Sequence, residues 1–166
     1  MYIFSVDITS YLQAEKMRKL ILILFLTLTS CSIKTEFFIY NTSDEIVTIE
    51  YQFIEQSEFG GFVSNPEMME SNWLSKLKEI KSSELTIDLT KKHITCRLKK
   101  GQALKLGWIG NYTPKSEYKK QELAENLKKL RIIRSGKETI IITEKEKVAD
   151  LFERVNSKRY EIKINE

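Results

Sequence analysis

The sequence predicts a mainly β domain, a β-sandwich-like fold with one to three helical insertions. Three observations support this fold class. Apolar and polar residues alternate in many short runs, turn-forming residues separate those runs, and few segments show the spacing of an amphipathic helix. About seven or eight short strands are expected. The alternative is an α+β sheet with a helix packed on one face.

Four strands are expected in the first hundred residues. Residues 47–53 give the clearest one, because Val, Ile, Tyr and Phe alternate there with Thr, Glu and Gln. Phe37 to Tyr40 form a preceding strand, and the cluster Asn41-Thr42-Ser43-Asp44 between the two is typical of a turn. The same alternation predicts strands at 85–90 and 94–99.

The second half of the chain adds further strands. Ala103 to Ile109 starts after the turn residues Lys99-Lys100-Gly101-Gln102. Leu130 to Ile133 and Thr139 to Ile142 flank Arg134-Ser135-Gly136-Lys137, and the glycine suits the positive φ that a hairpin turn requires. A last strand is expected over residues 160–165, where alternation resumes.

One helix is well marked near the C-terminus. Thr143-Glu144-Lys145-Glu146 has the pattern of a capping box, in which the first and last side chains satisfy each other's backbone amides. An apolar stripe follows at relative positions 0, +3, +4 and +7, formed by Val148, Leu151, Phe152 and Val155.

Two further helices are plausible because an X-Pro pair can open each of them. Asn65-Pro66 would begin the first and Thr113-Pro114 the second. The apolar residues that would carry these helices are Met69, Trp73 and Leu77 in the first, and Leu123, Leu127 and Leu130 in the second.

Composition indicates one ordinary globular domain. The chain has 166 residues, of which 42% are hydrophobic and 30% charged, and its two prolines and six glycines form no linker. The formal net charge is +4, with lysine and glutamate interspersed. A nucleic-acid partner would favour a basic stripe on one face, so none is expected.

The N-terminal region has the order of parts of a secretory signal peptide. Arg18 and Lys19 give a positive start, Leu20 to Leu28 are apolar, and Thr29-Ser30 precede Cys31. The uncharged run is shorter than the roughly 20 apolar residues that a membrane-spanning helix needs.

Leu28-Thr29-Ser30-Cys31 resembles the lipobox of bacterial lipoproteins. The resemblance implies that the sulfur of Cys31 receives a diacylglyceryl group, that a dedicated peptidase cleaves before it, and that the new amine is acylated with a fatty acid such as palmitate. Cys31 is therefore the expected lipidation site. The mature domain is similar to small uncharacterised lipoproteins of Bacteroidetes-like bacteria.

This interpretation divides the chain into three parts. Residues 1–16 carry Asp7 and Glu15, which signal peptides rarely have, so we expect an overlong extension with translation starting at Met17. Residues 17–30 are the signal, and 31–166 form one mature β-rich domain with a lipid anchor. Ser32 after the cysteine favours the outer membrane of the bacterial cell envelope. Because residues 32–36 match surface-export signals poorly, the periplasmic face is expected.

No catalytic or metal-ligating set is predicted, and no cofactor. His93 is the only histidine, and Cys96 lies in an alternating strand, where a buried small hydrophobe is expected. Gly107-Trp108-Ile109-Gly110 is interpreted as a strand end and turn because no lysine follows. A solvated helical face accounts for the carboxylates Glu67, Glu70, Glu122 and Glu125.

The remaining candidates concern binding. Trp73, Trp108 and Tyr112 could form an aromatic platform for a sugar or peptide, although at least one tryptophan is expected in the core. Phe59-Gly60-Gly61-Phe62 could form an exposed apolar patch. The expected role is an anchored binding or accessory module for an envelope protein or glycan, with no specific ligand assigned. A structural lipoprotein without a ligand is the alternative, and an envelope enzyme is less favoured.

Overall fold

A computed structural model describes residues 15–19, 33–53, 66–71, 76–134, 140–142 and 145–165. The chain divides into two units, residues 1–32 and 33–166. In the first unit, residues 15–19 are helical, and Lys19 forms an ion pair with Glu15 at 2.9 Å. The second unit contains the β-rich domain, and all the elements below belong to it.

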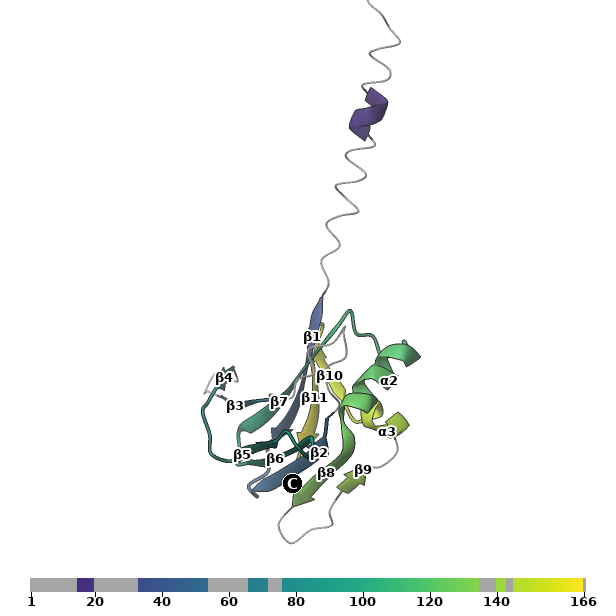
Figure 1. Ribbon diagram of the computed structural model, residues 1–166. Helices are drawn as coiled ribbons and strands as arrows, with labels where there is room; N and C mark the ends of the chain where they lie inside the picture. The colour runs from purple at the N-terminus through teal and green to yellow at the C-terminus, as the bar shows by residue number, and fades with distance from the viewer. Residues whose placement is uncertain are drawn as a thin grey trace, which may run out of the picture. The chain divides into compact units, whose positions relative to one another are not determined.

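Two sheets build the domain (Figure 1). The first has six strands in the spatial order β10 (Glu153–Asn156), β11 (Arg159–Ile164), β1 (Lys34–Asn41), β7 (Gln102–Gly110), β3 (Glu67–Ser71) and β4 (Leu77–Glu79). The second has five strands in the order β5 (Leu85–Asp88), β6 (His93–Leu98), β2 (Val47–Gln52), β8 (Lys128–Arg134) and β9 (Ile140–Ile142). Among the described strands, only β1 and β11 pair in parallel.

The core lies between the two sheets because alternate residues of both face inward. On β1, Phe37 and Ile39 are fully buried, and on β2 so are Val47 and Ile49. These residues belong to one hydrophobic cluster with apolar side chains of both sheets. The predicted mainly β fold with helical insertions is therefore confirmed.

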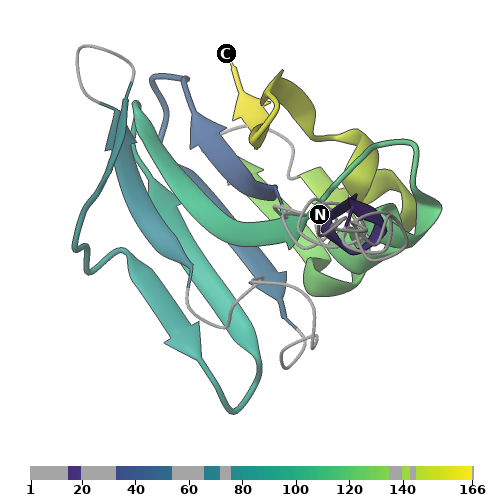
Figure 2. The same cartoon turned by 90° about the horizontal axis from the view of Figure 1, so that it is seen from above.

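Two helices, α2 (Glu117–Asn126) and α3 (Lys145–Asp150), lie together on one side of the domain (Figures 1 and 2). Ser116 caps α2, since its hydroxyl accepts a hydrogen bond from the amide of Lys119 at 3.4 Å. Leu123 of α2 and Val148 of α3 are buried in the core. Lys120 and Asp150 approach each other to 3.7 Å and join the exposed sides of the helices.

The C-terminal helix is shorter than its apolar stripe predicted. It ends at Asp150, and Val155 lies in β10 with 55% of its surface exposed. Val148 and Phe152 are buried as expected, whereas Leu151 is 36% exposed. The edge of β11 offers backbone hydrogen bonds to the segment after Phe152, and these outweigh one more helical turn. Thr143 and Glu144 of the capping box lie outside the described residues.

The helix predicted after Asn65-Pro66 is wrong. The segment forms β3 and β4, with Met69 opposite Glu79. Met68 is buried opposite Leu104 of β7. The segment forms a strand because its side chains alternate between buried and more exposed and because β7 offers an edge with which it can pair. Trp73 lies outside the described residues.

The helix predicted after Thr113-Pro114 is correct in part. It begins at Glu117, and Leu123 and Leu127 are buried as expected. Leu130 instead belongs to β8, because the helix ends at Asn126 and Lys129 takes a positive φ of 53° at the start of that strand.

The predicted hairpin pairs as expected, with Leu130 opposite Ile142 and Ile132 opposite Ile140. Its turn, residues 135–139, lies outside the described residues.

Candidate functional site

The outer face of the six-stranded sheet is the candidate functional surface. Successive side chains of a strand point to opposite faces, and Phe37 and Ile39 of β1 point into the core. The intervening residues Glu36, Phe38 and Tyr40 therefore face outward. The register adds Lys105 of β7 and Glu161 of β11 opposite Phe38.

An ion-pair cluster crosses three strands of this face. The ammonium group of Lys105 lies 3.2 Å from the carboxylate of Glu36 on β1 and 3.0 Å from that of Glu67 on β3. Partial burial opposes the charge of Lys105, but the hydrogen bonds with Glu67 and Glu36 outweigh it and raise its pKa. The cluster therefore holds β3, β7 and β1 together with opposite charges.

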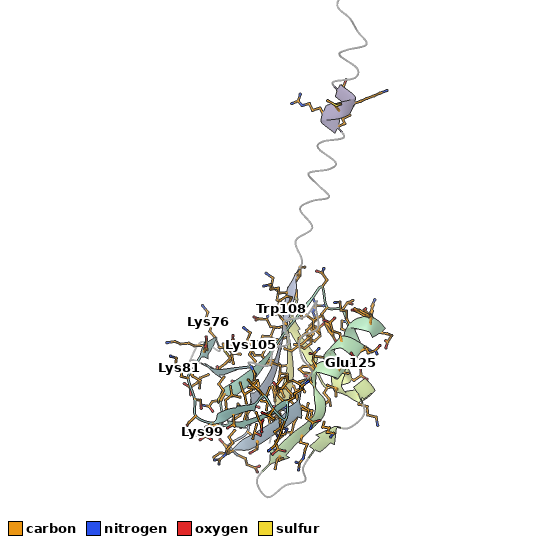
Figure 3. All side chains as sticks on the ribbon, viewed as in Figure 1. Lys76, Lys81, Lys99, Lys105, Trp108 and Glu125 are labelled. Carbon is orange, nitrogen blue, oxygen red and sulfur yellow. The ribbon has the colours of Figure 1, made fainter. Side chains whose placement is uncertain are left out.

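Cations also cover two aromatic rings of this face. The Nζ atom of Lys34 lies 4.6 Å from the centroid of the Trp108 ring, and the Arg159 guanidinium lies 4.8 Å from that of Phe38. Arg159 also pairs with Glu161. Phe38 is only 3% exposed as a result, whereas Trp108 keeps part of its ring accessible. Trp108, like Tyr40, is thus a partly exposed aromatic residue of this face that can contact a partner (Figure 3).

Two loops are fixed to the first residues of β1. Two hydrogen bonds join Ile33 to Asn111. The amide of Ile33 donates to the side-chain oxygen of Asn111 at 2.9 Å, and the amide of Asn111 donates to the carbonyl of Ile33 at 2.8 Å. Asn111 has a φ of 51°, a conformation that asparagine tolerates well. On the other side, the amide of Glu36 donates to the carbonyl of Lys158 at 2.8 Å.

The structure does not bring Trp108 and Tyr112 into one aromatic platform. Tyr112 packs edge-on against Phe37 at 4.9 Å and Tyr160 at 5.0 Å, on the core side of the sheet. Burial, followed by the nearby Tyr160 and Asp150, raises the pKa of Tyr112 to about 12. Tyr112 is therefore mainly a packing residue.

His93 and Gly110 lie among the residues that the structure describes. His93 is half-buried at the start of β6, opposite Gln52 and Asp88 in the ladder. Gly110 ends β7, as the interpretation of Gly107-Trp108-Ile109-Gly110 expected. Cys31 and residues 59–62 lie outside the described residues.

The carboxylates expected on a solvated helical face behave differently. Glu67 and Glu70 lie on β3, a strand. Glu122 does lie on α2 but is only 8% exposed, and its carboxylate pairs with Lys119 at 2.9 Å. The sequence cannot reveal this burial, since it depends on tertiary packing around α2, to which α3 contributes. Glu125 is hydrogen-bonded to Gln121 at 3.1 Å on the exposed side.

Sequence reasoning missed the outer face as a site. The alternation along β1 already indicated this face. Phe37 and Ile39 point into the core, so the residues at the even positions point outward: Lys34, Glu36, Phe38 and Tyr40. The partners on β7 and β11 could not be assigned without the register.

In the parts of the chain that the structure describes, no three His, Cys, Asp or Glu side chains are grouped to hold a metal ion. In those same parts, no helix is both long and apolar enough to cross a membrane.

The thiol of Cys96 should be almost unreactive in the folded protein. Its side chain is fully buried on β6, and this burial, followed by the charge of Glu84, raises its pKa to about 12. At pH 8 the thiolate population should be about a thousandfold below that of an ordinary cysteine. Alkylation of the Cys31→Ser protein, followed by mass spectrometry with and without urea, measures this. Rapid labelling without urea would contradict the buried placement.

No protein-family model matches the chain, and no similar curated protein or solved structure was found.

Proposed function

We propose that the protein is a lipid-anchored module of a bacterial cell envelope, attached through Cys31 and acting as a binding or accessory protein. The observation that carries the proposal is the order of a positive start, an apolar run and a lipobox-like sequence ending at Cys31. The strand β1 begins at Lys34, three residues further on, so little chain would separate the lipid from the domain.

The anchor has a clear physical purpose. One acyl chain binds a membrane only marginally, whereas two or more hold a protein there stably. Ser32 after the cysteine favours the outer membrane as the location. The partly exposed Trp108 on a face rich in charged groups supports a binding or accessory role.

A structural lipoprotein without a ligand is the second candidate. One observation favours it: Lys105, Glu36 and Glu67 satisfy one another on the outer face, and Arg159 covers Phe38 there. A surface whose charges are already paired offers fewer groups to a ligand.

Replacing Cys31 by serine should abolish lipidation and leave the precursor uncleaved, because the sulfur is the proposed acceptor of the diacylglyceryl group. Expression of both forms in a bacterium with labelled palmitate measures this, together with the gel mobility of the product. We expect label and the faster mature band for the unchanged protein, and neither for the variant.

The matched control is Cys96→Ser, which removes the other cysteine and leaves the signal intact. It should incorporate label like the unchanged protein. Normal processing of Cys31→Ser, or labelling that depends on Cys96, would overturn the proposal.

A further inference from the structure

The end of the domain that follows Cys31 combines exposed apolar groups with unpaired cations. Ile33 is 49% exposed and Val155 is 55% exposed, and Trp108 is partly exposed on β7, opposite Glu36 of β1. We define the anchor-proximal end by six residues contributed by β1, β7, β10 and the adjoining loops: Ile33, Lys34, Trp108, Lys115, Val155 and Lys158.

These residues converge because the hydrogen bonds at the start of β1 fix both loops there. The bonds between Ile33 and Asn111 hold the loop that carries Lys115, and the bond from Glu36 to the Lys158 carbonyl holds the turn between β10 and β11. Asn156 stabilises that turn, since its side-chain oxygen accepts a hydrogen bond from the amide of Lys158 at 2.8 Å.

The charge of this end is not balanced by its own acids. Within the described residues, Lys34, Lys115 and Lys158 are exposed and none has a carboxylate at ion-pair distance. The acids closest in sequence to them are already occupied. Glu36 pairs with Lys105 at 3.2 Å, Glu117 pairs with Lys120 at 3.5 Å, and Glu161 pairs with Arg159. Three positive charges therefore remain for an external anion.

We propose that the anchor-proximal end binds the surface of an anionic phospholipid membrane. The inference rests on the proposed lipid anchor, because Cys31 precedes Lys34 by three residues and an extended chain of that length spans at most about 11 Å. Lysine with tryptophan at a membrane surface is a favourable combination, since the ring suits the interface and the ammonium groups attract anionic headgroups. The membrane contact orients the domain and leaves its far end toward other partners.

The test couples residues 31–166 to vesicles through Cys31 itself. Among the residues that the structure describes, every buried one lies between Thr35 and Ile164, so residues 31–166 contain that core. Cys96 is buried, and a maleimide-bearing lipid should therefore react with Cys31 alone. Coupling in this way does not depend on processing in a cell. Failure here is thus distinguishable from failure of the proposed lipidation, which the Cys31→Ser experiment tests.

The readout is the fluorescence of Trp108 in a Trp73→Phe background, with brominated phospholipid as the quencher. Vesicles of phosphatidylcholine alone are compared with vesicles that contain phosphatidylglycerol. We expect a blue shift and quenching only with the anionic lipid, and loss of both at high salt. Replacing Lys34, Lys115 and Lys158 by glutamine should weaken the contact about fivefold for each lysine, or roughly a hundredfold together.

A matched triple variant replaces Lys78, Lys99 and Lys163, which are exposed and lie toward the opposite end of β1. The amide of Gly101, two residues after Lys99, donates to the carbonyl of Asn41, the last residue of β1. Figure 3 shows Lys99 well separated from Trp108. This control removes the same charge and should keep most of the quenching. Equal quenching on both lipids, or an equal loss in both triple variants, would overturn the proposal.

A second readout needs no change at Trp73. Acetylation of lysine amines in the tethered protein, followed by mass spectrometry, should be slower at Lys34, Lys115 and Lys158 on anionic than on neutral vesicles. It should be unchanged at Lys78, Lys99 and Lys163. Equal reactivity of both groups on both lipids contradicts a membrane contact at this end.

Discussion

Replacing Phe37 by alanine should lower the free energy of unfolding by about 3–5 kcal/mol. Phe37 is fully buried on β1, in the middle strands of the six-stranded sheet. Its ring lies 4.9 Å from that of Tyr112, 5.2 Å from Phe152 and 5.7 Å from Tyr160. The substitution removes a shared partner of three rings, so it leaves a cavity that those rings cannot easily fill.

Urea unfolding of residues 32–166 followed by circular dichroism measures this loss. Phe38→Ala is the matched control, because Phe38 is the next residue and the same residue type but lies on the outer face under Arg159. Arg159 can settle into the vacated space, and we expect a smaller loss of about 1–2 kcal/mol. An equal loss in the two variants would contradict the assignment of inner and outer faces.

Much of the sheet structure could be predicted from alternation alone. Along residues 47–53 the period of two is unbroken, and β2 is a central strand whose Val47 and Ile49 are buried as the pattern requires. The hairpin of β8 and β9 is local, so its turn residues indicated the pairing. These elements need no information from distant parts of the chain.

The wrong helices show where local patterns are insufficient. Met69, Trp73 and Leu77 are spaced as on a helix, but β7 has an open edge that takes up residues 67–71 as a strand. Val155 fits a helical stripe equally well, yet β11 pairs with its segment. The partner strand of the first segment is distant in sequence, and that of the second follows it in the chain. Each partner strand supplies backbone hydrogen bonds and so determines the conformation.

The candidate site was predictable only in part for the same reason. Trp108 was recognised as a residue of interest, and the parity of β1 placed Glu36 and Phe38 on one face. The contact of Arg159 with Phe38, however, depends on the parallel pairing of β1 with β11, more than a hundred residues later in the chain. No local spacing in the sequence encodes that register.

Replacing Asn41 by alanine should lower the free energy of unfolding by about 2–4 kcal/mol, although the residue is polar and ends β1 next to a turn. Asn41 is fully buried at the end of β1. Its Nδ2 donates to the carbonyls of Glu45 at 2.8 Å and Leu98 at 2.9 Å, and its Oδ1 accepts from the amide of Ser43 at 3.0 Å and the hydroxyl at 2.8 Å. Alanine would leave these groups without their partner in the interior, where an unmade hydrogen bond is expensive.

Urea unfolding again provides the measurement, with Thr42→Ala as the control. Thr42 is the next residue, and its hydroxyl donates to the carbonyl of Ile164 at 2.8 Å in a less buried place. Water can replace that bond, so we expect a loss below about 1 kcal/mol. A cost at Asn41 no greater than that at Thr42 would contradict the role of the side chain in joining the β1 turn to β6.

Asn41→Asp separates the loss of the donor from the loss of the whole side chain. The carboxyl group keeps an acceptor for Ser43 but turns an oxygen toward the carbonyls of Glu45 and Leu98. Burial and these carbonyl dipoles disfavour its charged form, so its pKa in the folded protein should lie above the unfolded value of about 3.9. Well below about pH 3.9 the group is neutral in both states, and the penalty from its charge is absent. As the pH rises from the unfolded pKa toward the folded pKa, the unfolded state loses its proton first, and stability falls relative to the unchanged protein. Above the folded pKa the penalty is complete. A stability difference that does not vary between pH 3.5 and 8 would show that the two carbonyls do not face this side chain.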